Sequence, residues 1–198
     1  MAMIGMRYVV ATPLTAHTDG SEPTYGTGVV VGRAMTANLT INRANNPLRA
    51  DDIDAEDDNG ITSMQVSIGV DDISEEVQAT PLGLLEKVTT GSGQTEQTYY
   101  LESAKSGNYV GLGYMRVRRY HGVTSYQGIW IYKAIFGFTS ENAETKQETI
   151  NWQTPTLEGK AEALQTRGSG EPVFRKKANF TTAAACIAWL NGLAGISA

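Results

Sequence analysis

Residues 29–83 read VVVGRAMTANLTINRANNPLRADDIDAEDDNGITSMQVSIGVDDISEEVQATPLG, and this stretch decides the architecture of the chain. From Val29 to Ile41 apolar and polar residues alternate, and the alternation resumes from Ile61 to Val70. A period of two residues over such lengths is typical of β-strands with one covered face. Because each strand must bury that face against other elements, the stretch predicts a scaffold unit within a larger β-rich domain.

An acidic segment, residues 43–60, separates these two strands. Asn45-Asn46-Pro47 ends the first strand, because proline lacks an N–H donor and restricts the residue before it. We expect a long exposed loop, because packed like charges are costly unless they are solvated or face cations. An EF-hand calcium loop is the weaker alternative, since neither its glycine nor its terminal glutamate falls at the required position. The charged residues of the loop are Arg49, Asp51, Asp52, Asp54, Glu56, Asp57 and Asp58.

A short helix is expected after the second strand. Asp72 or Ser74 is a suitable N-cap, and Glu75 and Glu76 then lie in the first turn, where the helix dipole favours carboxylates. Pro81 limits this helix to about two turns.

The sections on either side of the deciding stretch are rich in glycine. Residues 1–28 are interrupted by proline and glycine too often for a long strand, so we expect an N-terminal arm with at most one short strand near Arg7–Ala11. Such an arm is either frayed or ordered against a neighbouring subunit. Residues 87–98 read as a glycine- and threonine-rich connection without a phosphate-loop signature.

The second half of the chain predicts several strands and one helix. Residues 122–138 are the most apolar stretch, with aromatic and aliphatic residues alternating, so both faces should be covered and Gly128 should mark a bulge or bend. The other expected strands are Thr98–Ala104, Tyr109–Tyr120, Glu148–Leu157 and a following strand interrupted by Gly168 and Gly170.

Residues 180–193 predict a C-terminal helix capped by Thr181 or Thr182 and ended by glycine. Ala185, Ala188 and Trp189 share one side of it and should face the core. The predicted fold is therefore a single mainly β domain over residues 1–198. Its form is an antiparallel β-sandwich or barrel with a short central helix and a C-terminal helix.

Composition narrows the class of protein. The net charge of −5 and pI near 5.1 argue against a sequence-specific nucleic-acid binder, which normally presents a basic face. The chain has one cysteine and so no internal disulfide, which fits folding in a reducing cytoplasm. We expect no signal peptide and no membrane anchor, because no apolar run approaches the length that spans a bilayer.

No catalytic constellation is evident. His17 and His121 lie in predicted loops without metal-binding neighbours, and Cys186 lies in an alanine-rich helix where a buried inert thiol is expected. There is no nucleophile elbow and no dinucleotide fingerprint. The sequence predicts no enzyme, no catalytic residue, no metal and no cofactor.

One basic and aromatic cluster is present, formed by Arg116, Arg118 and Arg119 with Tyr114 and Tyr120. Residues two apart on a strand share a face, so Arg116 and Arg118 should point the same way. The cluster is a candidate inter-subunit or phosphate-contacting patch. The alternative is that these arginines pair with acids on an adjacent strand or subunit.

Taken in order, the chain resembles the major tail proteins, or tail tube proteins, of long-tailed bacteriophages of Gram-positive bacteria. The segments that carry the resemblance span residues 24–193. They are TYGTGVVVGRAMTANLTIN (24–42), PLRADDIDAED (47–57), the strand and helix ending at Leu82-Gly83, WIYKAIFGF (130–138), TINWQTPTLEGKAEAL (149–164) and FTTAAACIAWLNGL (180–193).

The resemblance implies a β-sandwich or barrel that assembles into hexameric rings. Stacked rings would form a tail tube with a β-lined lumen, through which DNA passes without specific binding. The loop from Arg43 to Gly60 would contact the next ring. Other expected partners are the tape measure, terminator and distal tail proteins of the phage, and the expected location is the virion after synthesis in the host cytoplasm.

Two alternatives remain open from the residues. Trp130, Trp152 and the tyrosines suit a monomeric β-sandwich that binds carbohydrate or a cell surface. A neck or adaptor protein of the same fold is the other alternative.

Overall fold

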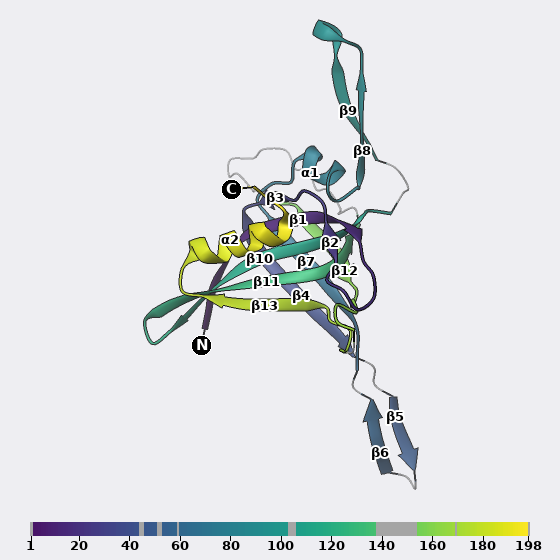
Figure 1. Ribbon diagram of the computed structural model, residues 1–198, viewed down its shortest axis with the longest axis vertical. Helices are drawn as coiled ribbons and strands as arrows, with labels where there is room; N and C mark the ends of the chain where they lie inside the picture. Colours follow the sequence, from purple (N-terminus) through teal and green to yellow (C-terminus); the bar gives the residue numbers. More distant parts are fainter. Residues whose placement is uncertain are drawn as a thin grey trace, which may run out of the picture.

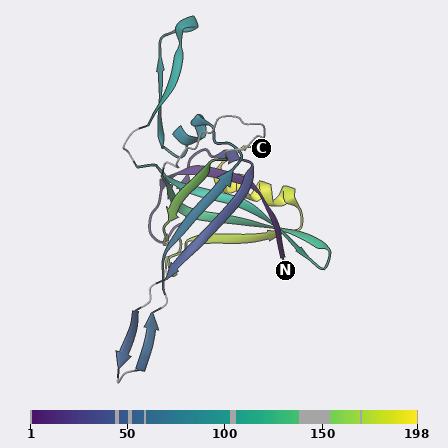
Figure 2. The same ribbon diagram turned by 180° about the vertical axis from the view of Figure 1, so that it is seen from behind.

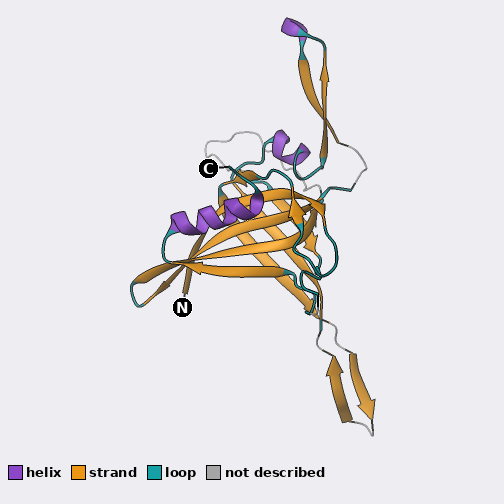
Figure 3. Cartoon of the chain, viewed as in Figure 1, coloured by secondary structure: helices purple, strands orange, loops and turns teal. Residues whose placement is uncertain are grey.

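The structure, a computed structural model, describes residues 2–43, 46–50, 53–58, 60–102, 106–137, 154–168 and 170–197. Within these residues the protein is mainly β, every strand pair is antiparallel, and two α-helices are present (Figures 1 and 3). This confirms the predicted class of a mainly β fold with a central and a C-terminal helix.

A nine-stranded sheet forms the body of the molecule, and its main path runs β2-β1-β10-β11-β12-β7-β4. Its strands are β1 (Ala2–Ala16), β2 (Thr24–Tyr25), β3 (Val29–Gly32), β4 (Ala34–Arg43), β7 (Ile61–Val70), β10 (Tyr109–Tyr120), β11 (Val123–Phe136), β12 (Thr156–Ala161) and β13 (Arg175–Phe180). The sheet branches at β11, which pairs with β13 along residues 126–131 and with β12 along residues 134–136. Among the described strands the sheet does not close, because β4 ends the path with one edge unpaired.

The branch lets the sheet fold over on itself. β12, β7 and β4 cross diagonally over β1, β10 and β11 (Figure 2), and a core of interlocking side chains fills the space between them. From one side this core takes Met64, Val66 and Ile68 of β7, and from the other Leu112, Ile129 and Ile131, all of them buried. The alternation read in residues 29–41 and 61–70 is therefore confirmed as the β4–β7 pair, with β3 set off from β4 at Arg33.

The outer face of β1, β10 and β11 is covered by α2 (Ala183–Ala194). Thr182 caps α2 by accepting a hydrogen bond from the backbone N–H of Ala185, and Gly195 ends it in the left-handed conformation. Both ends agree with the sequence prediction. Ala185 and Ala188, however, are exposed, and the buried stripe is Cys186, Leu190 and Ala194. The helix is so rich in alanine that periodicity alone did not fix its inward face.

The first helix, α1 (Glu75–Ala79), follows the prediction closely. Ser74 is the N-cap, its side chain accepts from the N–H of Val77, and Val77 is the buried residue of the helix. No helix in the described part of the chain is long and apolar enough to cross a bilayer.

The predicted N-terminal arm is wrong. Residues 2–16 form one long strand, β1, that lies inside the sheet between β10 and the short strands β2 and β3. Val9, Val10 and Ala11 are fully buried. A bulge at Tyr8, which has a φ of 57°, interrupts the pairing and hid the alternation. Most of the glycine and proline signals belong to the turns after β1, whereas Pro13 lies within the strand.

Two segments predicted as connections are hairpins instead. Residues 46–58 contain β5 (Asn46–Ala50) and β6 (Ile53–Asp58), and residues 85–102 contain β8 (Leu85–Thr90), a 3-10 turn and β9 (Gln97–Glu102). Neither hairpin pairs with the main sheet, and they project at opposite ends of the long axis (Figure 1). Asp51 and Asp52 lie outside the described residues, as does part of the strand expected at Thr98–Ala104.

The strands predicted in the second half differ in how they turn out. Tyr109–Tyr120 is β10 as predicted, and β11 has both faces buried as expected, but Gly128 makes no bulge because it pairs in register with Met115. The strand interrupted by glycine is only a bridge between Leu164 and Val173. The strand expected at Glu148–Leu157 falls largely outside the described residues, and β12 begins at Thr156.

Candidate functional site

The outward side of β4, β7 and β12 is a continuous surface of short polar side chains, here called the polar face. The pairing register places Asn38 beside Ser67 and Glu158 in one row, and Thr40 beside Gln65 and Lys160 in the next. With a single carboxylate and a single ammonium group, the surface is close to neutral. Its members are Thr36, Asn38, Thr40, Asn42, Ser63, Gln65, Ser67, Thr156, Glu158 and Lys160.

The polar face ends at the unpaired edge of β4, which is ten residues long. A free edge presents a row of backbone donors and acceptors, and soluble proteins usually block such edges with proline, lysine or a covering element. β4 contains neither proline nor lysine. Met35 and Ile41 on this strand are also exposed. The edge is therefore ready to pair with another strand.

The β8–β9 hairpin is anchored at its base and apolar on one side. Lys87 Nζ lies 2.8 Å from Glu76 Oε2 of α1, and the Tyr100 hydroxyl donates to the same carboxylate at 3.0 Å. These hydrogen bonds lower the pKa of Glu76. On the other side Tyr99 and Leu101 are 42% and 46% exposed. The anchor directs the hairpin away from the body, with apolar side chains left in solvent.

The β5–β6 hairpin is the segment predicted to contact a neighbouring ring. Among the described elements, β5 and β6 make extensive contact only with each other. Their strands include Arg49, Asp54, Glu56, Asp57 and Asp58 of the predicted loop. A two-stranded hairpin alone is marginally stable in water, so contacts within the described part of the subunit give this one little stabilisation.

Four cations gather on one side of β10 and β13, and we call them the basic face: Arg116, Arg118, Arg175 and Lys177. Arg116 Nη2 donates to the Tyr114 hydroxyl at 3.2 Å. Partial desolvation of its ammonium group, followed by the nearby charges of Arg175, Arg116 and Arg118, lowers the pKa of Lys177.

The register of β10 tests which of the predicted arginines share a face. Arg116 and Arg118 share a face as expected, whereas Arg119 follows directly in a regular strand and points to the other side. Arg175 and Lys177 were missed, although their spacing in RKKANF shows the same period of two as Arg116 and Arg118.

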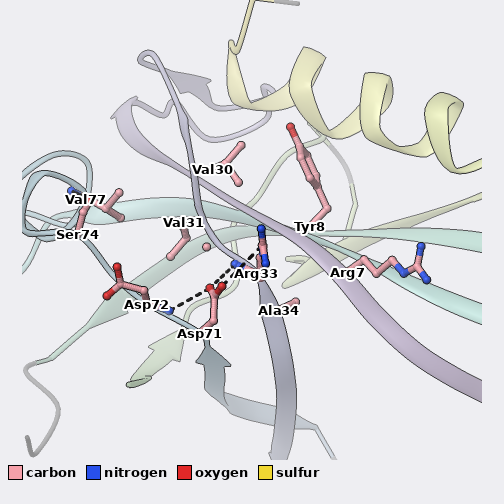
Figure 4. Close-up of a pocket in the computed structure, with 11 residues that line it drawn as sticks. Arg7, Tyr8, Val30, Val31, Arg33, Ala34, Asp71, Asp72, Ser74 and Val77 are labelled. Carbon is pink, nitrogen blue, oxygen red and sulfur yellow. Dashed lines mark hydrogen bonds and ion pairs between the residues drawn. The ribbon is translucent and has the colours of Figure 1, made fainter. Parts of the chain in front are cut away.

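An open pocket of about 600 Å³ lies where β3 bends into β4, beside β1 and the start of α1 (Figure 4). Asp71 holds the bend, because its Oδ1 accepts from the backbone N–H groups of Arg33 at 2.7 Å and Asp72 at 3.0 Å. Gly32 is required there, since a Cβ would lie 2.5 Å from the Asp72 carbonyl oxygen. The exposed apolar wall includes Val30. The pocket lies at the bend of the edge strand, and among its charged residues Asp71 is engaged in holding that bend.

The residues considered for chemistry lie apart. His17 Nε2 lies 3.2 Å from the Gln165 carbonyl oxygen, and His121 occupies the two-residue turn between β10 and β11. Cys186 is buried as predicted, and burial raises the pKa of its thiol to about 11. Within the described ranges no three His, Cys, Asp or Glu residues gather as metal ligands.

Trp130, the tryptophan suggested for sugar binding, is fully buried. Its indole N–H donates to the Tyr25 hydroxyl at 3.2 Å, and the two rings meet edge to face with centroids 5.3 Å apart. Sugar stacking requires an exposed ring face, so Trp130 has no such role. Trp152 lies outside the described residues.

Comparison with known proteins finds no family model that matches the chain and no matching curated protein sequence.

Proposed function

We propose that the protein is a structural subunit of a bacteriophage tail tube, which assembles through hexameric rings that stack into a conduit for DNA. In this proposal the folded-over sheet is a tail-tube-type β-sandwich, and β12, β7 and β4 form its inner sheet. The observation that carries the proposal is the polar face, which ends in the unprotected edge of β4. Pairing of that edge with a neighbouring subunit would continue the sheet around a ring.

The chemistry of the polar face supports a lumen-lining role. Proteins that hold DNA neutralise its phosphates with clustered lysine and arginine. The polar face has one lysine, Lys160; Thr40, on the far side of Gln65 in the same row, and most other members are short and uncharged. A wall of this kind gives DNA little to bind, so DNA would slide past it.

The two projecting hairpins support stacking. They leave the body at opposite ends of its long axis (Figure 1), so the two ends of a subunit are different. Contacts between unlike surfaces run head to tail and continue into filaments unless a rotation closes them. In this proposal, edge pairing through β4 closes each ring, and contacts made by the hairpins join one ring to the next. The tape measure, terminator and distal tail proteins would then be the partners at the tube ends.

Negative-stain electron microscopy of the purified protein at rising concentration tests the proposal. We expect rings with a central channel and, at higher concentration, tubes. A matched variant replaces Met35 and Thr40 of β4 by lysine, which introduces the charge that natural edge strands use against pairing. This variant should stay monomeric with an unchanged circular dichroism spectrum. Wild-type protein that remains monomeric at every concentration would contradict the proposal, and rings that never stack would favour a neck or adaptor protein.

A further inference from the structure

The basic face lacks carboxylate partners within the described part of the subunit. The carboxylates that form ion pairs in this part of the chain pair with cations outside the basic face, for example Glu162 with Lys133 at 2.6 Å and Glu22 with Lys176 at 3.3 Å. The hydrogen bonds of the basic face go to neutral groups instead, such as Arg118 Nη1 to Asn179 Oδ1 at 3.4 Å. Four like charges are therefore held together without local compensation among the described residues.

The position of these cations leaves them accessible. They continue the inner side of the β10–β11–β13 layer, because Lys177 pairs with Ile129 and Arg175 with Ile131, both core residues. β4 and β7 cross this layer diagonally and leave the end with the β10–β11 hairpin uncovered (Figure 2). Lys177 is exposed and the three arginines are half-buried. An acidic group from another molecule can reach this end of the layer.

The chain itself supplies a segment of the opposite charge. β5 and β6 contain four carboxylate residues, Asp54, Glu56, Asp57 and Asp58, against the single Arg49. Figure 1 shows this hairpin extending away from the body, and it makes extensive contact with no other described element. Among the described elements, β5 and β6 make no extensive contact with β10 or β13, the strands that carry the basic face.

We propose that the basic face of one subunit receives the acidic β5–β6 hairpin of a second copy. The proposal rests on the proposed function, and it names the surface that the stacking hairpin would contact. Charge complementarity selects this occupant, because four cations meet four carboxylates and the two sets lie apart within one subunit. Nucleic acid fits less well, because a basic face of this size is small for a nucleic-acid interface and the whole chain is acidic.

Charge reversal in two separate variants tests the contact. One variant carries Arg118→Glu and Lys177→Glu, and the other carries Glu56→Lys and Asp57→Lys. Arg118→Glu and Lys177→Glu leave the face with two positive and two negative side chains, and Glu56→Lys and Asp57→Lys remove the net negative charge of the two hairpin strands. Each variant alone therefore loses the charge complementarity of the contact, so we expect tube formation to fall at least tenfold by sedimentation and electron microscopy. An equimolar mixture should assemble more readily than either variant alone, because the acidic hairpin of the first variant meets the unchanged basic face of the second, and the reverse contact brings the introduced lysines to the introduced glutamates. Arg119→Glu, on the other side of β10, is the matched control and should assemble normally.

The outcomes separate the two proposals. Two results would overturn this contact and leave the tail tube proposal standing. One is normal tubes from the wild type and from both reversed variants. The other is a mixture that does not assemble although each variant keeps the circular dichroism spectrum of the folded protein. Wild-type protein that never assembles would overturn both. Fluorescence anisotropy with duplex DNA provides a further check. Tight binding that disappears in the Arg118→Glu, Lys177→Glu variant, while tubes still form, would assign the basic face to DNA and overturn the contact.

Discussion

The body of the molecule and its two projecting hairpins differ in what holds them in place. In the body, two cores on opposite sides of the β1–β10–β11 layer bury side chains from nearly every strand and from α2. The hairpins have little of this: β8–β9 is tied to α1 by Glu76, and β5–β6 contacts mainly itself. Burial of apolar surface is the main favourable term in folding. The body therefore carries the stability, and the hairpins are held by few contacts within the described part of the subunit.

The same difference separates the residues that stabilise the fold from the residues expected to act in association. Core positions are fixed by packing within the subunit, so their substitution should lower the free energy of unfolding. Hairpin and edge positions contribute little to that free energy, so their substitution should change association and leave folding nearly intact. Four experiments test how sharp this division is.

The largest effect is expected for Trp130→Ala, in the core between α2 and the sheet. The ring is fully buried and its N–H donates to the Tyr25 hydroxyl, so truncation leaves a cavity and removes the hydrogen bond that this hydroxyl accepts, while its own bond to the Tyr132 carbonyl oxygen stays. We expect the free energy of unfolding to fall by about 3–5 kcal/mol in urea denaturation. Val123→Ala, at an exposed position of the same strand, is the control and should cost under about 0.5 kcal/mol. Similar losses for the two variants would contradict the role of this core.

Alkaline pH should weaken the body through Tyr132. Burial, followed by the nearby Glu22 carboxylate, raises the pKa of its hydroxyl to about 12 in the folded state. The folded state therefore keeps a proton that the unfolded chain loses near pH 10, so this stability is complete below pH 10 and is lost as pH rises toward 12. The loss should reach about 2–3 kcal/mol, measured by urea denaturation at stepped pH. Tyr132→Phe should flatten this slope, whereas Tyr120→Phe at an exposed position should not.

Two glycines test how closely α2 lies on the sheet. A Cβ at Gly128 would lie 2.6 Å from the Trp189 ring, so Gly128→Ala should push the helix outward and cost about 1–3 kcal/mol. Gly192 lies within α2, and a methyl group added there would meet no neighbouring atom within 4 Å, so Gly192→Ala should add up to about 1 kcal/mol through helix propensity. Thermal unfolding measures both. Equal signs for the two changes would contradict the close packing of α2.

The smallest effect on folding is expected when residues 46–58 are replaced by a short glycine-serine linker. Because β5–β6 makes little contact with the body, the free energy of unfolding should change by less than about 1 kcal/mol, the scale of a loop-length effect. Assembly should be lost at the same time. A large loss of stability on removal would show that the hairpin belongs to the body.

Sequence patterns predicted the parts of the fold in which local and tertiary preferences agree. The alternation in β4, β7 and β10 and the Ser74 and Thr182 caps all have local causes. β1 escaped prediction because a bulge at Tyr8 breaks its period. Gly128 suggested a bulge. Glycine is needed there for another reason, because the Trp189 ring, about sixty residues distant in sequence, lies against it. Such contacts exist only once the sheet and helix have come together.

The candidate surfaces were predictable to different degrees. Arg116 and Arg118 were placed on one face by strand periodicity, but adding Lys177 required the pairing of β13 with β11. The polar face needed the register of three strands, because the sequence alone does not show which polar sides adjoin. The acidic segment was recognised by composition. Its hairpin pairing was not, since Asp and Glu are rare in strands.

Cryo-electron microscopy of assemblies formed by the purified wild-type protein tests the central claim most directly. The account predicts rings in which Asn38, Thr40 and Gln65 of the polar face line the channel, with the edge of β4 paired to the next subunit and the β5–β6 hairpin reaching another ring. Protein that stays monomeric, or an assembly with the polar face on its outer surface, would contradict the account.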